Sequence, residues 1–135
     1  MKRALALCLS AAALAGCNGG TVDKHALKRD AEKIGSLATE GQLLAKDMAK
    51  GASTKNYARV HAAELSRAAS NFADALATRP ISPGIAAKVH KLSRLAAKVS
   101  IRLDQLRLHP TNRAVAKAMQ QPLSDDADAA DRLRK

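Results

Sequence analysis

Few residues in this chain of 135 residues carry side chains suited to catalysis or metal binding: four histidines, two cysteines and twelve carboxylates. His61 and Glu64 are three residues apart and would share one face of a helix. A metal site in a helical bundle combines such pairs from several helices, and the sequence has no second pair of this kind. The spacing therefore favours a histidine at the edge of a core, and we expect no metal site.

Cofactor and enzyme motifs give a similar result. A haem held between helices would need an axial ligand such as Met48 or Met119 together with a histidine, and no Cys-x-x-Cys-His stretch is present for covalent attachment. Methionines more often fill gaps in a core. The sequence contains no glycine-rich phosphate loop, Gly-x-Ser-x-Gly or His-Glu-x-x-His motif. We expect no catalytic residue and no cofactor, and a bundle carrying metal or haem is the last of the alternatives.

The surroundings of the second cysteine are more informative. Lys2 and Arg3 precede an apolar run from Ala4 to Leu14, and small residues follow that run. This is the layout of a secretory signal peptide. The run is shorter than the roughly 20 apolar residues needed to cross a bilayer. The segment is therefore predicted to direct export and to take no part in the fold.

The four residues Leu14, Ala15, Gly16 and Cys17 resemble the lipobox of bacterial lipoproteins. The resemblance implies that residues 1–16 are removed as a signal peptide by cleavage before Cys17, after its thiol has received a diacylglycerol. Fatty acyl chains such as palmitate would then hold the chain on a membrane through Cys17, and residues 17–22 would form the lipidated tether. An ordinary secretory peptide is the alternative.

The resemblance also bears on location. Asn18, next to the cysteine, is not the Asp that retains such lipoproteins in the inner membrane. The expected location is the cell envelope: the outer membrane in a Gram-negative cell, or the outer face of the cytoplasmic membrane in a Gram-positive one.

Composition favours an all-helical domain. One Phe, one Tyr and no Trp leave a core of Ala, Leu, Ile and Val, and Ala and Leu favour helices over strands. With Cys8 removed and Cys17 acylated, no cysteine would remain for a disulfide or a thiolate metal site. Helix packing alone would then stabilise the fold.

The helical pattern divides the chain into three long segments, from Asp23 to about 50, 55 to 77 and 83 to 108. Ser82 and Pro83 fit the start of the third segment. In the second, the expected buried face is Tyr57, Val60, Leu65, Ala68, Phe72 and Leu76. The third shows the clearest seam, Ile85, Val89, Leu92, Ala96, Val99, Leu103 and Leu106.

Short loops between these segments predict an up-down-up three-helix bundle over residues 23–122. Thr111 would cap a short fourth helical element, which Pro122 would end. Residues 123–135 are predicted to form an acidic, charged C-terminal tail, either a short helix or disordered.

Positive charge dominates the body of the protein. The formal net charge is +11, and loss of Lys2 and Arg3 with the signal peptide would lower it to +9. Five basic residues lie opposite the seam of the third helix: Lys88, Lys91, Arg94, Lys98 and Arg102. This basic strip suits a polyanion such as anionic lipid, lipopolysaccharide or teichoic acid, and the plain alternative is a solvated helix face. Nucleic acid is not expected, because the stacking aromatics of single-strand binders are almost absent.

These features together predict a non-catalytic, membrane-anchored envelope lipoprotein whose helical domain is an interaction or structural module. Its partners would be the membrane, reached through the acyl chains of Cys17, and anionic envelope polymers or another envelope protein. A polyanion-binding protein that uses the basic strip is the second possibility.

Overall fold

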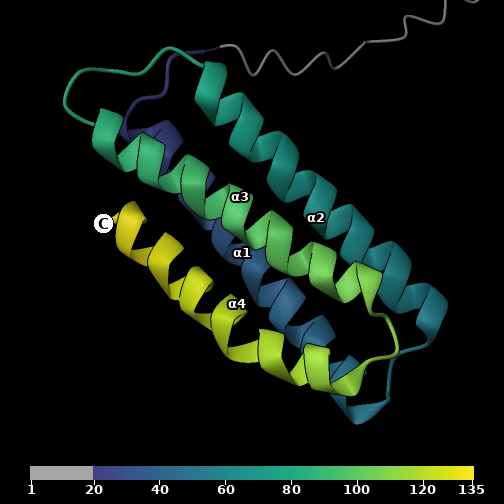
Figure 1. Ribbon diagram of the computed structural model, residues 1–135. Coiled ribbons are helices and arrows are strands. Elements are labelled where there is room, and N and C mark those ends of the chain that lie inside the picture. The colour runs from purple at the N-terminus through teal and green to yellow at the C-terminus, as the bar shows by residue number, and fades with distance from the viewer. Residues whose placement is uncertain (1–19) are drawn as a thin grey trace, which may run out of the picture.

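The computed structural model describes residues 20–135, which fold into four helices with no β-strand among them. These are α1 (Lys24–Lys50), α2 (Lys55–Thr78), α3 (Ala86–Leu108) and α4 (Arg113–Arg134). In Figure 1 the helices lie side by side, and short loops join consecutive helices at opposite ends of the molecule. The most extensive contacts pair α1 with α4 and α2 with α3. The predicted all-α helical bundle is confirmed, but the fourth element, which was predicted to be short, is a helix of 22 residues and similar in length to the other three.

Side-chain caps explain three of the four helix starts. The Asp23 carboxylate accepts a hydrogen bond from the amide of Ala26 at 2.7 Å. The Thr54 hydroxyl accepts from the Tyr57 amide at 3.3 Å, and the Asn112 side chain accepts from the first amides of α4. Each cap satisfies a backbone N–H that has no partner inside its own helix. The cap of α4 is therefore Asn112, one residue after the predicted Thr111.

The third helix begins later than its sequence predicts. Ser82 does not cap it; its amide instead donates to the carbonyl of Val22 at 3.0 Å. Gly84 then adopts a left-handed conformation, with φ of 85°, and α3 starts at Ala86 without a side-chain cap. Ser82 thus pairs with the residue before the first turn of α1 and supplies no cap to α3.

The buried seam of α3 is the one predicted. All seven of its residues are buried, and five of them are fully enclosed leucines or valines. A strict alternation of three- and four-residue steps leaves only one face that can enter the core. This seam is therefore part of the apolar core that the four helices share.

The predicted face of α2 is partly wrong. Tyr57 and Val60 are 57% and 52% exposed. The buried face consists mainly of alanines, with Leu65 and Leu76: Ala58, Ala62, Leu65, Ala69, Ala73 and Leu76. Small side chains let α2 approach α3 closely, and Ser66 and Ser100 accordingly donate to each other's backbone carbonyls at 3.0 and 2.9 Å. Close approach buries alanine here and leaves the larger side chains outside.

A second close contact between helices occurs at Gly41 of α1. A Cβ atom built on it would overlap Leu103 Cδ2 of α3 and lie 3.4 Å from Leu123 of α4. The absence of a side chain on this buried residue thus allows α1 to lie in close contact with α3. Leu103 therefore occupies the space that a side chain on residue 41 would fill.

The helix α4 continues through Pro122, where the sequence predicted a stop and a tail. Proline removes one backbone hydrogen bond from the helix. That loss is offset because the second half of α4 packs on the core through Leu123 and Ala130, which are fully buried. Arg102 of α3 also donates to the Pro122 carbonyl. Tertiary contacts thus extend a helix that local sequence would end.

The first described residues are fixed to the body of the bundle. Val22 is fully buried, and its amide donates to the carbonyl of Pro80 at 2.8 Å. Arg79 donates to the carbonyl of Gly20 and to the carboxylate of Asp30, each at 3.1 Å. Residues 17–22 were predicted to form a tether. The part of this segment that begins at Gly20 is bound to the α2–α3 loop and is therefore not a free linker.

Candidate functional site

The basic strip predicted on α3 is divided by the fold into two parts. Lys88, Lys91, Arg94 and Lys98 are exposed and line an open groove between α3 and α4. Arg102 is half-buried and pairs with Asp126 of α4. Four of the five predicted residues therefore share one surface, and the fifth takes part in the packing of two helices.

We call the first surface the basic groove. Its volume is about 560 Å³, and α4 contributes Ala129, Arg132 and Leu133 to it. Leu95 of α3, which is buried, also lines it. The lining thus combines five cationic side chains with three apolar ones and contains no carboxylate. A groove of this size and composition suits a small anionic group with apolar atoms attached.

The groove contribution of Arg132 and its apolar neighbours on α4 was not predicted from the sequence. The signal was present: Val115, Met119, Leu123, Ala130 and Leu133 follow each other at helical spacing. One member of this series, Asp126, is polar, and Pro122 interrupts the pattern. Both features concealed a continuous helical face.

Asp126 lies beside the basic groove and is 1% exposed. Its carboxylate pairs with Arg102 and, at 3.4 Å, with the ammonium of Lys98. A buried carboxylate needs such partners because its desolvation is costly. Lys98 therefore lines the groove and also pairs with Asp126. The other four cations of the groove have no ion-pair partner among residues 20–135: Lys88, Lys91, Arg94 and Arg132.

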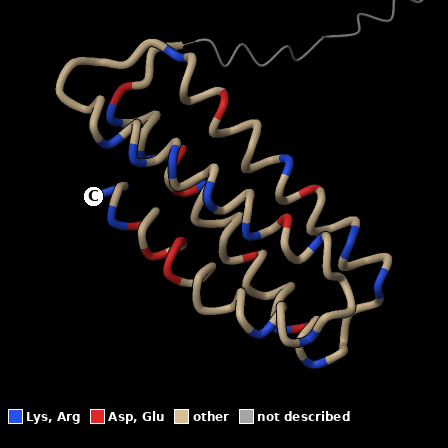
Figure 2. Tube along the Cα trace, viewed as in Figure 1, with Lys and Arg blue, Asp and Glu red and all other residues tan. Residues whose placement is uncertain are grey.

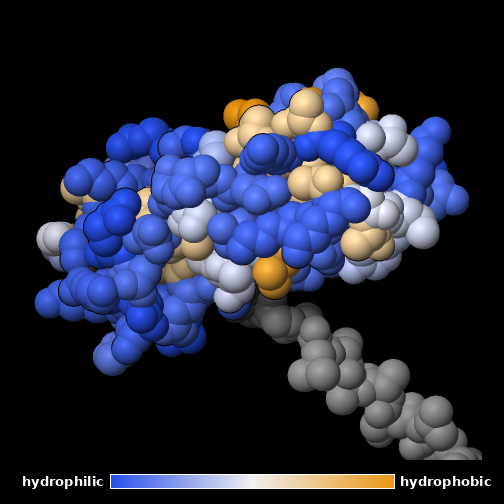
Figure 3. Space-filling model, turned by 90° about the horizontal axis from the view of Figure 1, so that it is seen from below, coloured by the Kyte–Doolittle hydropathy of each residue, from blue (hydrophilic) through white to orange (hydrophobic). Residues whose placement is uncertain are grey.

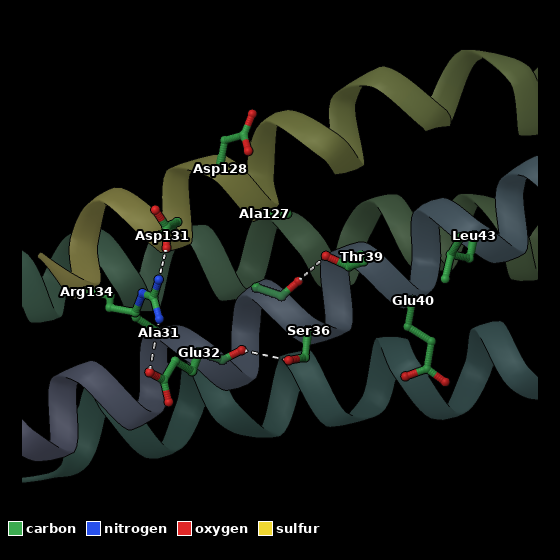
Figure 4. A pocket seen from close by; sticks show the side chains of 11 residues that line it. Ala31, Glu32, Ser36, Thr39, Glu40, Leu43, Ala127, Asp128, Asp131 and Arg134 are labelled. Carbon is green, nitrogen blue, oxygen red and sulfur yellow. Dashed lines mark hydrogen bonds and ion pairs between the residues drawn. The ribbon is translucent and has the colours of Figure 1, made fainter.

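A second groove of similar volume lies between α1 and the other side of α4. Figure 4 shows Arg134 between Asp131 of α4 and Glu32 of α1, with ion-pair distances of 2.6 and 3.3 Å. Hydrogen bonds from Lys135 and Arg134 lower the pKa of Asp131, and those to Asp131 and Glu32 raise the pKa of Arg134. Glu40 and Asp128 also line this acidic groove.

The two grooves differ in charge: cations line the one between α3 and α4, and the charged residues that line the one between α1 and α4 are mainly carboxylates. Figure 2 shows basic residues along α3 and acidic ones gathered in the second half of α4. Figure 3, seen from below Figure 1, shows a largely hydrophilic face on which apolar side chains form separate patches. The basic groove is therefore a local concentration of positive charge beside a surface of opposite sign.

The candidate metal pair lies on α2 facing α1. His61 Nε2 is 3.0 Å from the Glu40 carboxylate and its Nδ1 is 3.9 Å from Glu64, while its ring stacks on Tyr57. In the described residues no group of three or more His, Cys, Asp or Glu side chains is arranged to hold a metal ion. Met48, considered as a haem ligand, lies in the apolar core.

Cys17 and the residues Leu14, Ala15 and Gly16 lie outside the described residues. None of the helices within residues 20–135 is both long enough and apolar enough to span a membrane. Comparison with protein-family models, curated proteins and solved structures gave no match for this chain.

Proposed function

We propose that this protein is a lipoprotein of the cell envelope, anchored through acyl chains on Cys17. We further propose that its up-down-up-down bundle is a non-catalytic interaction module. The lipobox-like residues Leu14 to Cys17 suggest the anchor. The observation that carries the rest of the proposal is the attachment of Gly20 and Val22 to the bundle.

That attachment limits how far the bundle can lie from its anchor. Cys17 is three residues before Gly20, so the two Cα atoms are at most about 11 Å apart. More than one acyl chain on Cys17 would make the membrane association stable. The end of the bundle that carries Gly20 would then stay close to the lipid surface.

The same end of the bundle is basic. Lys24 at the start of α1, Lys88 at the start of α3 and Lys135 after α4 line one hollow there, together with Gly84 of the α2–α3 loop. Basic residues next to a membrane are attracted by anionic lipids. The bundle would thus present its positive end to the membrane and its remaining length to other envelope components.

Replacement of the acylated cysteine tests the proposal. We expect Cys17→Ser to abolish incorporation of a palmitate analogue and to move the protein from the membrane to the soluble fraction. Cys8→Ser is the matched control, because it removes the chain's other cysteine and should leave labelling and fractionation unchanged. Continued labelling of the Cys17→Ser protein would overturn the proposal.

A further inference from the structure

We propose that the basic groove binds the phosphate of an anionic phospholipid headgroup at the surface of the membrane in which Cys17 is anchored. The inference rests on the proposed function for the presence of that membrane. It extends the proposed function by assigning a ligand class and a set of binding residues. Arg132 of α4 belongs to that set together with Lys88, Lys91 and Arg94 of α3.

The first argument is the charge of the groove. Those four cations have no ion-pair partner in the described part of the chain, although acidic residues lie nearby on α4. Asp131 pairs with Arg134 and Lys135, and Asp126 pairs with Arg102 and Lys98. Asp126 and Asp131 are therefore already paired, and the four cations are available to an external anion. Arginine can bind a phosphate through two parallel hydrogen bonds.

The second argument is the apolar part of the lining. Leu95, Ala129 and Leu133 lie among the cations, and Leu133 is only partly covered by the core. A free phosphate or a hydrophilic phosphate polymer would gain little from these side chains. The glycerol and first methylene groups of a phospholipid would bury apolar surface against them. The mixed lining therefore favours a lipid headgroup.

The third argument is the position of the groove. Lys88 and Leu133 line both the basic groove and the hollow at the Gly20 end of the bundle. The groove therefore adjoins the end of the bundle that carries Gly20, whose Cα atom is at most about 11 Å from that of Cys17. A tilt of the bundle about this attachment would bring the α3–α4 face onto the lipid surface.

Vesicle binding separates the basic groove from the acyl anchor. The full chain carrying Cys17→Ser, which has no acylation site at residue 17, is sedimented with phosphatidylcholine vesicles containing 30% or no phosphatidylglycerol. The neutral vesicles measure the contribution of the apolar N-terminal residues. The groove variant adds Lys91→Glu, Arg94→Glu and Arg132→Glu. Lys98 and Arg102 are left intact, because their change would also disturb Asp126.

The matched control reverses three exposed cations near the opposite end of the bundle, Lys55→Glu, Arg59→Glu and Lys117→Glu. One basic residue at an anionic surface contributes about fivefold in binding. We expect the groove variant to bind anionic vesicles about 100-fold more weakly, and the control to differ from its parent by less than about fivefold. Circular dichroism of both variants checks that the helices are retained.

Three results would overturn the inference. Equal weakening in the two triple variants would show that only net charge matters. Binding of inorganic phosphate without preference for anionic vesicles would identify a free anion as the ligand. Equal binding of the parent to neutral and anionic vesicles would remove the site altogether. Palmitate labelling of the wild-type chain is scored separately, so loss of the lipid site leaves the test of Cys17 unaffected.

Discussion

One guanidinium nitrogen of Arg102 in α3 donates to both the buried carboxylate of Asp126 and the backbone carbonyl of Pro122 in α4. The contact joins the two irregular features of α4, a buried charge and an internal proline. It also explains why Arg102 does not take part in the basic groove.

Removal of the Asp126 charge should therefore destabilise the fold. Breaking a fully buried pair costs about 3–5 kcal/mol, and the partial exposure of Arg102 lowers our expectation for Asp126→Asn to about 2–3 kcal/mol. Urea unfolding followed by circular dichroism measures the change. Asp128→Asn, on the exposed side of α4, is the control and should alter stability by less than about 0.5 kcal/mol. A loss of similar size in both variants would contradict the assigned role of Asp126.

Two glycines of α1 should respond in opposite directions to alanine. Gly41→Ala places a methyl group against Leu103, and such overpacking costs about 1–3 kcal/mol. At Gly35 the nearest atom to a new methyl would be the Ala130 Cβ, at 3.5 Å, an ordinary contact. Gly35→Ala should therefore gain the helix-propensity difference of about 1 kcal/mol. Thermal unfolding of both proteins distinguishes the two effects, and a stabilised Gly41→Ala protein would show that α3 and α4 can move away.

The acid sensitivity of the fold should depend on Asp131. Its pKa is below the ordinary value of 3.8 in the folded protein, because Lys135 and Arg134 donate hydrogen bonds to the carboxylate. The unfolded chain binds this proton more tightly, so the stabilisation is complete above the unfolded pKa and is lost as the pH falls through the folded value. We expect the free energy of unfolding of the Asp131→Asn protein to fall less steeply than that of the wild type as the pH is lowered from about 5 to about 2.

Urea midpoints at a series of pH values provide the measurement for Asp131. The matched control is Asp128→Asn, three residues earlier in α4, which should keep the wild-type slope. The prediction fails if the Asp131→Asn profile runs parallel to that of the wild type across the acid range.

The attachment of the first described residues should depend on Arg79. Arg79→Gln leaves the buried carboxylate of Asp30 without its cation and removes the hydrogen bond to Gly20. We expect a loss of about 2–3 kcal/mol and faster hydrogen exchange of the Val22 amide. Arg59→Gln, which changes an exposed arginine of α2, is the control. Unchanged protection of Val22 in Arg79→Gln would show that the two backbone hydrogen bonds suffice without Arg79.

The parts of the fold that the sequence predicts well are those where large apolar side chains mark one face. The seam of α3 is recognised because its leucines and valines recur at strict helical spacing and enter the core together. The buried face of α2 is not recognised from the sequence, because its alanines differ little from their neighbours in hydropathy and are buried by close contact between helices. Tyr57 and Val60 then look like the better core residues and are exposed.

The basic groove shows the same division. The groove residues of α3 can be predicted from the sequence, because Lys88, Lys91 and Arg94 recur at every third position and so share one helical face. The contribution of Arg132 depends on α4 continuing past Pro122, which tertiary packing decides. Likewise, nothing local distinguishes Arg102 from the groove cations, because its partner Asp126 is 24 residues away along the chain.

The pairing of Val22 with the α2–α3 loop also has a mechanical consequence. A pull on the chain before Gly20 is transmitted through the Arg79 contact and the two backbone hydrogen bonds of Val22 to the loop between α2 and α3, as well as to the first turn of α1. The load is thus shared by two helical pairs, and α1 is protected from being peeled away from α4 one turn at a time.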